Sequence, residues 1–238
     1  MQGLWTALSF LTILPVRKPG TRSPRDLGKA AIWFPLVGVL LGVLLVGFYF
    51  LLDGRVPDRL RAGLLLGLWV LLSGGLHLDG LADCLDGLLV TADRERRLTI
   101  LRDPGTGAFA VIGISLFLIL KAAALEGLTA ATVLLLAPAA GRSVMLLGMF
   151  YPSAREGGLG AVFKSGLTPL RIGAASFVPL LLAGTLGMQG FLALILAILT
   201  ALLVFQFAKA RIGGVTGDVL GAACELSELV VLFLFVVS

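Results

Sequence analysis

Residues 74–87 read GGLHLDGLADCLDG, and this stretch places three carboxylates inside an otherwise apolar sequence. Asp79, Asp83 and Asp86 are spaced i, i+4 and i+7, so at about 100° per residue they share one face of a helix. Acidic side chains at membrane depth need a cation, a basic partner or water to hold their charge, and a divalent metal ion meets that need. The stretch therefore predicts an acidic helix face that binds a cation.

The composition of the chain is that of an integral membrane protein. Of its 238 residues, 58% are hydrophobic and only 14% are charged, whereas about 25% of the residues of an average soluble domain are charged. The net charge of +5 would suggest nucleic acid as the partner of a soluble protein. Here the basic residues cluster between apolar segments, which is typical of cytoplasmic anchoring. We therefore predict the lipid bilayer as a partner, and no nucleic acid.

Apolar segments long enough to cross about 30 Å of hydrocarbon recur along the chain. We predict seven of them, at residues 31–52, 60–89, 107–126, 128–151, 172–188, 191–209 and 218–237. The second is longer than one crossing requires, so we expect it to protrude or to bend near Gly74 and Gly75. The predicted fold is an all-α, polytopic membrane protein with about seven transmembrane helices. Residues 1–238 would form a single membrane-embedded domain, with an interfacial segment at 1–29 and a helical bundle at 31–238.

The distribution of basic residues predicts the orientation of these segments. With the N-terminus in the cytoplasm, most of the 19 lysine and arginine residues fall on the cytoplasmic side, as the positive-inside rule requires. This topology brings Asp79, Asp83 and Asp86 close to the cytoplasmic surface. It places Asp103 and the start of segment 218–237 at the same surface.

A second acidic stretch, GGVTGDVLGAACELSE at residues 213–228, follows the same logic. Asp218 and Glu225 are seven residues apart and lie within about 20° of each other on a helix, whereas Glu228 is rotated by roughly 80°. An acidic cap at the start of a helix explains Asp218 equally well, but it does not explain Glu225. We predict Asp218 and Glu225 as metal ligands together with the first motif, and Glu228 as the weaker candidate.

Two polar residues in the connections are candidates for substrate binding. Asp103 lies in the turn before segment 107–126, where it or Thr106 either caps the helix or meets a ligand. Lys164 lies in a long connection that is rich in glycine and basic residues, a character that favours phosphate contact. Both residues are predicted to lie near the cytoplasmic surface.

Three further polar residues lie within the apolar segments. Arg142 is at a depth comparable to that of Asp79 and needs an acidic or a phosphate partner. Lys121 lies nearer the outer end of its segment, and we expect its side chain to snorkel toward the interface. His77 is about 160° from Asp79 on an unbroken helix. A hydrogen-bonded core histidine therefore explains His77 better than a catalytic base, unless the helix is distorted.

This set of residues suits Mg²⁺ bound between protein carboxylates and a diphosphate, because the donors are hard oxygen atoms without a cysteine or histidine cluster. The corresponding reactions transfer a phosphoryl-containing group or release a diphosphate, while the metal stabilises charge on the leaving oxygens. Phosphodiester-forming transferases and prenyl transferases both fit, and the residue pattern alone does not separate them. A cation transporter fits less well, because it would set its carboxylates at mid-membrane with outlets to both sides.

The two acidic motifs, HLDGLADCLDG at residues 77–87 and TGDVLGAACE at residues 216–225, resemble the cobalamin synthase family. The similarity continues in the same order through FLTILPV at 10–16, FPLVG at 34–38 and GLG at 158–160. It therefore covers nearly the whole chain. The resemblance implies a membrane transferase of vitamin B12 (cobalamin) biosynthesis that acts in assembly of the nucleotide loop.

The resemblance also implies the reaction, the cofactor and the partners. Adenosylcobinamide-GDP would give its phosphocobinamide group to a ribose hydroxyl of α-ribazole or of α-ribazole 5′-phosphate, with release of GMP and with Mg²⁺ as cofactor. The partners would be these substrates and other enzymes of nucleotide-loop assembly. The location would be the prokaryotic cytoplasmic membrane, with the active site facing the cytoplasm.

Roles in this reaction can be assigned to the predicted residues. The metal ligands would be Asp79, Asp83, Asp86, Asp218 and Glu225. Asp79, Asp83 and Asp86 would form the catalytic group, and within it Asp83 would accept the hydroxyl proton. Phosphate and substrate binding would fall to Arg142, Asp103, Lys164 and His77.

Overall fold

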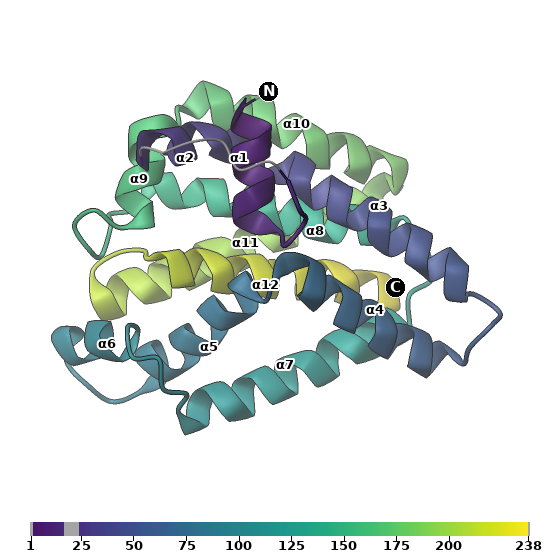
Figure 1. The fold of residues 1–238 in the computed structure, drawn as a ribbon, viewed down its shortest axis with the longest axis horizontal. Coiled ribbons are helices and arrows are strands. Elements are labelled where there is room, and N and C mark those ends of the chain that lie inside the picture. The colour runs from purple at the N-terminus through teal and green to yellow at the C-terminus, as the bar shows by residue number, and fades with distance from the viewer. Residues whose placement is uncertain (1, 17–23, 238) are drawn as a thin grey trace.

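The computed structural model describes residues 2–16 and 24–237, and all regular elements in these ranges are helices (Figure 1). The predicted all-α fold is therefore confirmed. Residues 17–23 of the expected interfacial segment lie outside the described residues. The elements are α1 (Gln2–Leu11), α2 (Pro24–Ala30), η1 (Ala31–Trp33), α3 (Phe34–Leu52), α4 (Asp58–Ser73), α5 (Leu76–Leu89), α6 (Arg94–Ile100), α7 (Ala108–Glu126), α8 (Val133–Met145), η2 (Leu146–Phe150), α9 (Leu159–Gly166), α10 (Pro169–Thr185), α11 (Gly187–Ile212) and α12 (Gly217–Val237).

Every predicted apolar segment coincides with one of these helices or with a pair of them. In the described ranges, five stretches are long and apolar enough to cross a membrane, and the bent pair α4–α5 brings the number to six if it is counted as one span. The remaining segment is α10, which is apolar but has only 17 residues. The five stretches are Asp26–Leu52, Ala108–Glu126, Val133–Phe150, Gly187–Ile212 and Gly217–Val237.

Large apolar side chains cover much of the outer surface of this bundle. Ile119 on α7 is 65% exposed and Leu203 on α11 is 71% exposed. An apolar surface of this extent is a liability in water, but it is the expected surface of a protein surrounded by lipid. The chain is therefore a multi-pass membrane protein.

The second predicted segment bends, as expected, at Gly74 and Gly75. The axes of α4 and α5 meet there at 92°. Both glycines are left-handed, with φ of 63° and 67°, a conformation that side chains with a Cβ rarely adopt. The Gly75 N–H donates to Val70 O and the Gly74 N–H to Leu71 O, which closes α4 as a Schellman motif. Because of this bend, α5 and its acidic motif run nearly perpendicular to α4.

Helix α12, yellow in Figure 1, runs through the middle of the molecule and packs against α5, α8 and α11. The contact with α5 is close because glycines occupy the crossing. A Cβ added to Gly80 would lie 2.9 Å from the backbone oxygen of Asp218, and one added to Gly221 would lie 3.2 Å from Cα of His77. The start of α12 is thus held directly against the acidic turn of α5.

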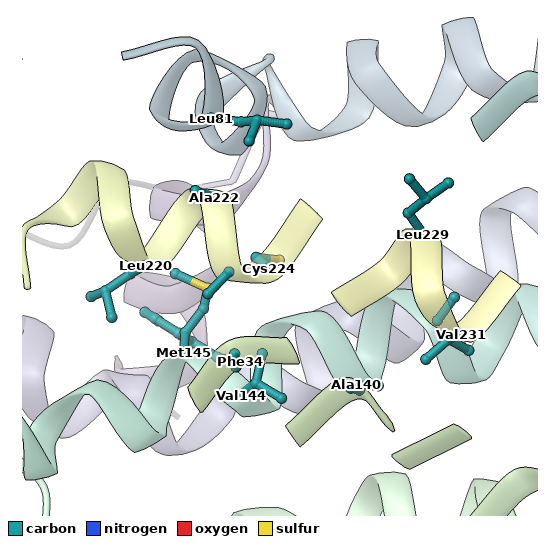
Figure 2. Close-up of a cluster of buried hydrophobic side chains, with 14 of the residues drawn as sticks. Phe34, Leu81, Ala140, Val144, Met145, Leu220, Ala222, Cys224, Leu229 and Val231 are labelled. Atoms are coloured by element: carbon teal, nitrogen blue, oxygen red, sulfur yellow. The ribbon is translucent and has the colours of Figure 1, made fainter. Parts of the chain in front are cut away.

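The buried core between α12 and α8 fixes the rotation of α12. Figure 2 shows Leu220 and Cys224 of α12 among the same group of apolar side chains as Val144 and Met145 of α8. Phe34, at the start of α3, belongs to this group and is fully buried. With these residues inside, Asp218 remains at the edge of the core, where α12 meets α5.

Candidate active site

The acidic side chains of α5 line a cavity of about 300 Å³. Asp79, Asp83 and Asp86 all face it, so the predicted common helix face is confirmed. The opposite wall is the turn before α7, residues 101–106, which contributes Asp103 and Arg102. Four of the predicted polar residues are therefore brought together at this cavity.

Asp86 differs from the other two aspartates because it caps α7. Its Oδ2 accepts the N–H of Gly107 at 2.6 Å and its Oδ1 accepts the N–H of Ala110 at 2.9 Å. A carboxylate in this position stabilises a helix start through both hydrogen bonds and the helix dipole. Of the two roles predicted as alternatives for Asp103 and Thr106, the helix cap is therefore wrong, and ligand binding stays a prediction. Asp103 Oδ1 accepts the N–H of Gly105 at 2.9 Å and shapes the turn.

Asp79 and Asp83 accept no hydrogen bond from any residue that the structure describes. Asp83 lies centrally, within electrostatic reach of Asp79, Asp86, Asp218 and Arg155. These two carboxylates are consequently available to a ligand in a way that Asp86 is not.

Asp218 approaches the acidic turn of α5 from α12, with its backbone against Gly80. It accepts a hydrogen bond from Thr216 Oγ1 at 3.1 Å, and its Oδ2 lies 4.0 Å from Nη1 of Arg155. The Val219 N–H donates to Thr216 Oγ1, so Thr216 and not Asp218 caps the start of this helix. The expectation that Asp218 adjoins the first acidic motif is confirmed by its interaction with Asp79 and Asp83.

Glu225 is separated from these aspartates, contrary to its predicted place beside them. It is buried about two turns further along α12, where Lys121 Nζ lies 2.7 Å from Glu225 Oε2 and 2.6 Å from Glu228 Oε2. The physical reason is the orientation of α7, which turns Lys121 inward until it is only 2% exposed. The expectation that Lys121 snorkels is therefore wrong.

Arg142 belongs to the same buried group of charges. It is fully buried, and its Nη1 forms an ion pair with Oε1 of Glu228. The predicted need for a partner is confirmed, and the described partner is an acidic residue of α12. The alternative role of Arg142 in phosphate binding stays a prediction. Glu228, the weaker metal candidate, serves as a counter-ion. Its Oε2 binds Lys121 and its Oε1 binds Arg142.

His77 faces this buried group and not the cavity. It is 2% exposed, and neither ring nitrogen has a hydrogen-bond partner among the described residues. Its nearest charged neighbours are Arg142 and Lys121. The expected burial of His77 in the core is thus confirmed, and its expected hydrogen bond stays a prediction. The side chain of Lys164 lies outside the described part of the structure.

Arg155 lies beside Asp218, and the residue pattern did not predict it as a site residue. A second cavity of about 200 Å³ is lined by Arg155, Asp218, Thr216 and Gly217 among others. Partial burial lowers the pKa of the Arg155 guanidinium below its usual value, and the Asp218 carboxylate acts in the opposite direction. Arg155 keeps its charge at neutral pH, because an arginine side chain is not deprotonated in proteins. The only sequence signal was the basic, glycine-rich character of the connection at residues 153–170.

Comparison with known proteins places this arrangement in a family. The sequence model described as cobalamin-5-phosphate synthase matches residues 3–236. The chain belongs to the cobalamin-5-phosphate synthase family. The resemblance read from the two acidic motifs is thereby confirmed.

Curated members of the cobalamin-5-phosphate synthase family align with this chain over almost its full length. A protein of Pseudomonas savastanoi pv. phaseolicola named adenosylcobinamide-GDP ribazoletransferase is 45% identical over 242 residues, which cover 98% of each chain. A protein of Pseudomonas paraeruginosa with the same name is 45% identical over 237 residues, covering 98% of this chain and 96% of the relative. No solved structure matches the chain.

The carboxylates of this cobalamin-5-phosphate synthase family member can be tested for their fit to Mg²⁺. Among the described residues, no three His, Cys, Asp or Glu side chains form a ready-made metal site. Mg²⁺ commonly binds through one or two carboxylates, several waters and substrate phosphates. Asp79 on α5 and Asp218 on α12 interact electrostatically and supply oxygen donors from two helices. The donor set therefore fits a magnesium ion that is completed by a diphosphate, and does not fit a cage built by protein alone.

Proposed function

We propose that this protein is a membrane transferase that joins adenosylcobinamide-GDP to α-ribazole or to α-ribazole 5′-phosphate. The products are adenosylcobalamin or its 5′-phosphate, and GMP. The names of the full-length relatives support this activity. The observation that carries the site is the cavity in which Asp79 and Asp83 have no described hydrogen-bond partner, next to Asp218 from the opposing helix.

The reaction replaces the phosphoanhydride bond of the diphosphate by a phosphate ester bond to the ribose. The ribose hydroxyl oxygen of α-ribazole attacks the phosphorus that carries the cobinamide. The bond from this phosphorus to the bridging oxygen breaks, and GMP leaves with that oxygen. Asp83 accepts the hydroxyl proton, because it lies between Asp79 and Asp86 on the face of α5 that lines the cavity and has no hydrogen-bond partner among the described residues.

Asp79 and Asp218 are the residues that would hold Mg²⁺. When bound, the ion supplies positive charge that stabilises the diphosphate oxygens as the leaving group departs. Asp86 contributes by holding the start of α7 in place through its two backbone hydrogen bonds. This assignment removes Glu225 from the metal site, because Lys121 already neutralises it.

We place the site at the cytoplasmic face of the prokaryotic cytoplasmic membrane. The positive-inside distribution of basic residues supports this orientation. The polar character of both substrates supports it as well, because a nucleotide-linked substrate reaches the site from water. Interaction with other enzymes of nucleotide-loop assembly stays a prediction.

The activity is tested by GMP release from the purified protein in detergent, supplied with adenosylcobinamide-GDP, α-ribazole and Mg²⁺. We expect release to require all three components, and a prenyl diphosphate in place of adenosylcobinamide-GDP to give no product. Asp83→Asn should lower the rate by about 100-fold or more, the usual contribution of a positioned proton acceptor. Glu95→Gln on the exposed face of α6 is the matched control. A folded Asp83→Asn protein that releases GMP at the wild-type rate would refute the assignment.

A further inference from the structure

The connection that carries Arg155 is fastened to the start of α12. The Ala154 N–H donates to Val215 O at 3.0 Å, and the Val215 N–H donates to Pro152 O at 2.8 Å. Arg94 of α6 joins both sides, because its Nη2 donates to Ala154 O at 3.1 Å and its Nε donates to Ile212 O at 3.0 Å. The backbone of Arg155 is therefore held next to Asp218 before any ligand arrives.

The guanidinium of Arg155 has donors that the protein leaves unused. Its Nη2 donates to Leu98 O at 3.3 Å. Its Nη1 is 4.0 Å from Asp218 Oδ2, which is too long for a hydrogen bond. Its Nε is buried and has no hydrogen-bond partner among the described residues. A guanidinium offers five N–H donors in a planar fork, an arrangement that suits phosphate oxygens.

The negative charge near the acidic cavity also favours a positively charged side chain in contact with the substrate. Asp79, Asp83 and Asp218 lie close to one another, and a diphosphate would add further negative charge to theirs. Lys121 and Arg142, which are buried in the bundle, are paired with Glu225 and Glu228 and do not line the cavity.

Arg155 is near these aspartates, and the hydrogen bonds of the connection hold its backbone in place. It interacts electrostatically with Asp218 and Asp83, and its side chain is only 19% exposed. Arg102, in the wall of the larger cavity, is exposed to solvent. Arg155 therefore has the more defined position of the two.

We propose that Arg155 is a substrate-binding residue that holds one phosphate of the diphosphate beside Asp218. In the bound state, its Nε and Nη1 donate to the phosphate oxygens. The cavity lined by Arg155, Thr216 and Gly217 would accommodate this phosphate. The inference rests on the proposed function in that the diphosphate is the one carried by adenosylcobinamide-GDP.

The test compares Arg155→Gln and Arg155→Lys with Arg96→Gln, a change of the same net charge at an exposed position of α6. We expect Arg155→Gln to raise the KM for adenosylcobinamide-GDP by about 10- to 100-fold, the effect of losing a hydrogen bond to a charged group. The KM for α-ribazole should stay within about twofold of the wild-type value. The KM of Arg155→Lys for adenosylcobinamide-GDP should lie between those of wild type and Arg155→Gln, because an ammonium keeps the charge but not the planar fork of donors. An unchanged KM for adenosylcobinamide-GDP, or an equal rise of both KM values, would overturn the proposal.

Binding of inorganic pyrophosphate with Mg²⁺, measured by calorimetry on the same purified proteins, separates this proposal from the proposed function. Weaker binding to Arg155→Gln than to Arg96→Gln would support the phosphate contact even if adenosylcobinamide-GDP were not the substrate. Equal binding to both variants would overturn it even if GMP release were confirmed. If Arg155→Gln fails to fold, the test uses Arg155→Lys alone. A pyrophosphate affinity of Arg155→Lys equal to that of the wild-type protein would contradict the proposal.

Discussion

At the scale of single residues, one motif supplies carboxylates for two different purposes. Asp86 gives both of its oxygens to backbone N–H groups at the start of α7. Asp79 and Asp83 face the same cavity without such partners in the described structure. Equal spacing on a helix face therefore does not imply equal roles.

This difference predicts that Asp86 and Asp79 contribute unequally to the free energy of unfolding. Asp86→Ala should lower the free energy of unfolding by about 1–2 kcal/mol, the usual cost of removing a helix cap. Asp79→Ala should leave the stability nearly unchanged, because no described group loses a hydrogen bond. Thermal unfolding of both variants in the same detergent measures this difference, while both should lose GMP release. Equal destabilisation by the two substitutions would contradict the structural role of Asp86.

Residue patterns could predict which side chains share a helix face, but not which neighbours they meet. Periodicity placed Asp79, Asp83 and Asp86 together because they belong to one helix. The partner of Arg142 was limited to an acidic group or a phosphate, and the choice of Glu228 depends on how α8 packs against α12. Arg155 was missed because its proximity to Asp218 arises from pairing between two distant connections.

At the scale of elements, the close crossing of α5 and α12 builds the site. The crossing depends on Gly80 and Gly221, where any side chain would meet the opposing backbone. It sets Asp218 beside Asp79 and Asp83 although the two motifs are far apart in the sequence.

Gly80→Ala should therefore separate the two helices slightly and misplace Asp218. We expect a loss of stability of about 1–3 kcal/mol from overpacking and a drop in GMP release of at least about tenfold, since small misplacements of catalytic groups are costly. Gly67→Ala on α4 is the matched control, because a Cβ there meets nothing within 4 Å. It should be neutral or slightly stabilising. Wild-type activity of Gly80→Ala would show that the crossing does not position the site.

Helix boundaries were largely predictable, whereas helix rotation was not. Apolar length predicted the spans, and paired glycines predicted the bend between α4 and α5. A helix that is apolar on nearly all sides shows no preferred face in its sequence. This is why the inward orientation of Lys121 on α7 could not be foreseen.

At the scale of the whole molecule, charges form two separate groups along α12. One lies at its start, where Asp218 adjoins Arg155. The other is buried deeper in the bundle and joins Lys121 and Arg142 to the two glutamates Glu225 and Glu228. Lys121 also lies 4.2 Å from the ring centre of Trp69, so this group connects α4, α7, α8 and α12.

The deeper group should act on stability and not on the chemistry. Lys121→Met leaves Glu225 and Glu228 with less compensation, and we expect it to cost about 3–5 kcal/mol, as when one partner of a buried ion pair is removed. The double variant Lys121→Met/Glu225→Gln should recover part of this loss, because it removes one of the uncompensated charges. Unfolding of the single and double variants in detergent checks both expectations. A double variant less stable than Lys121→Met would contradict this account.

The break at Gly74 and Gly75 has a consequence for how the protein enters the membrane. An aspartate at the centre of a helix makes insertion by the translocon less favourable by about 2.5–3.5 kcal/mol, and α5 carries three. Because α5 is not a straight continuation of α4, α4 need not carry α5 with it into the bilayer. α5 packs against α7 and α12, and α12 is the last helix in the described structure. The acidic motif is thus synthesised early, and its site is assembled only after α12 has been made.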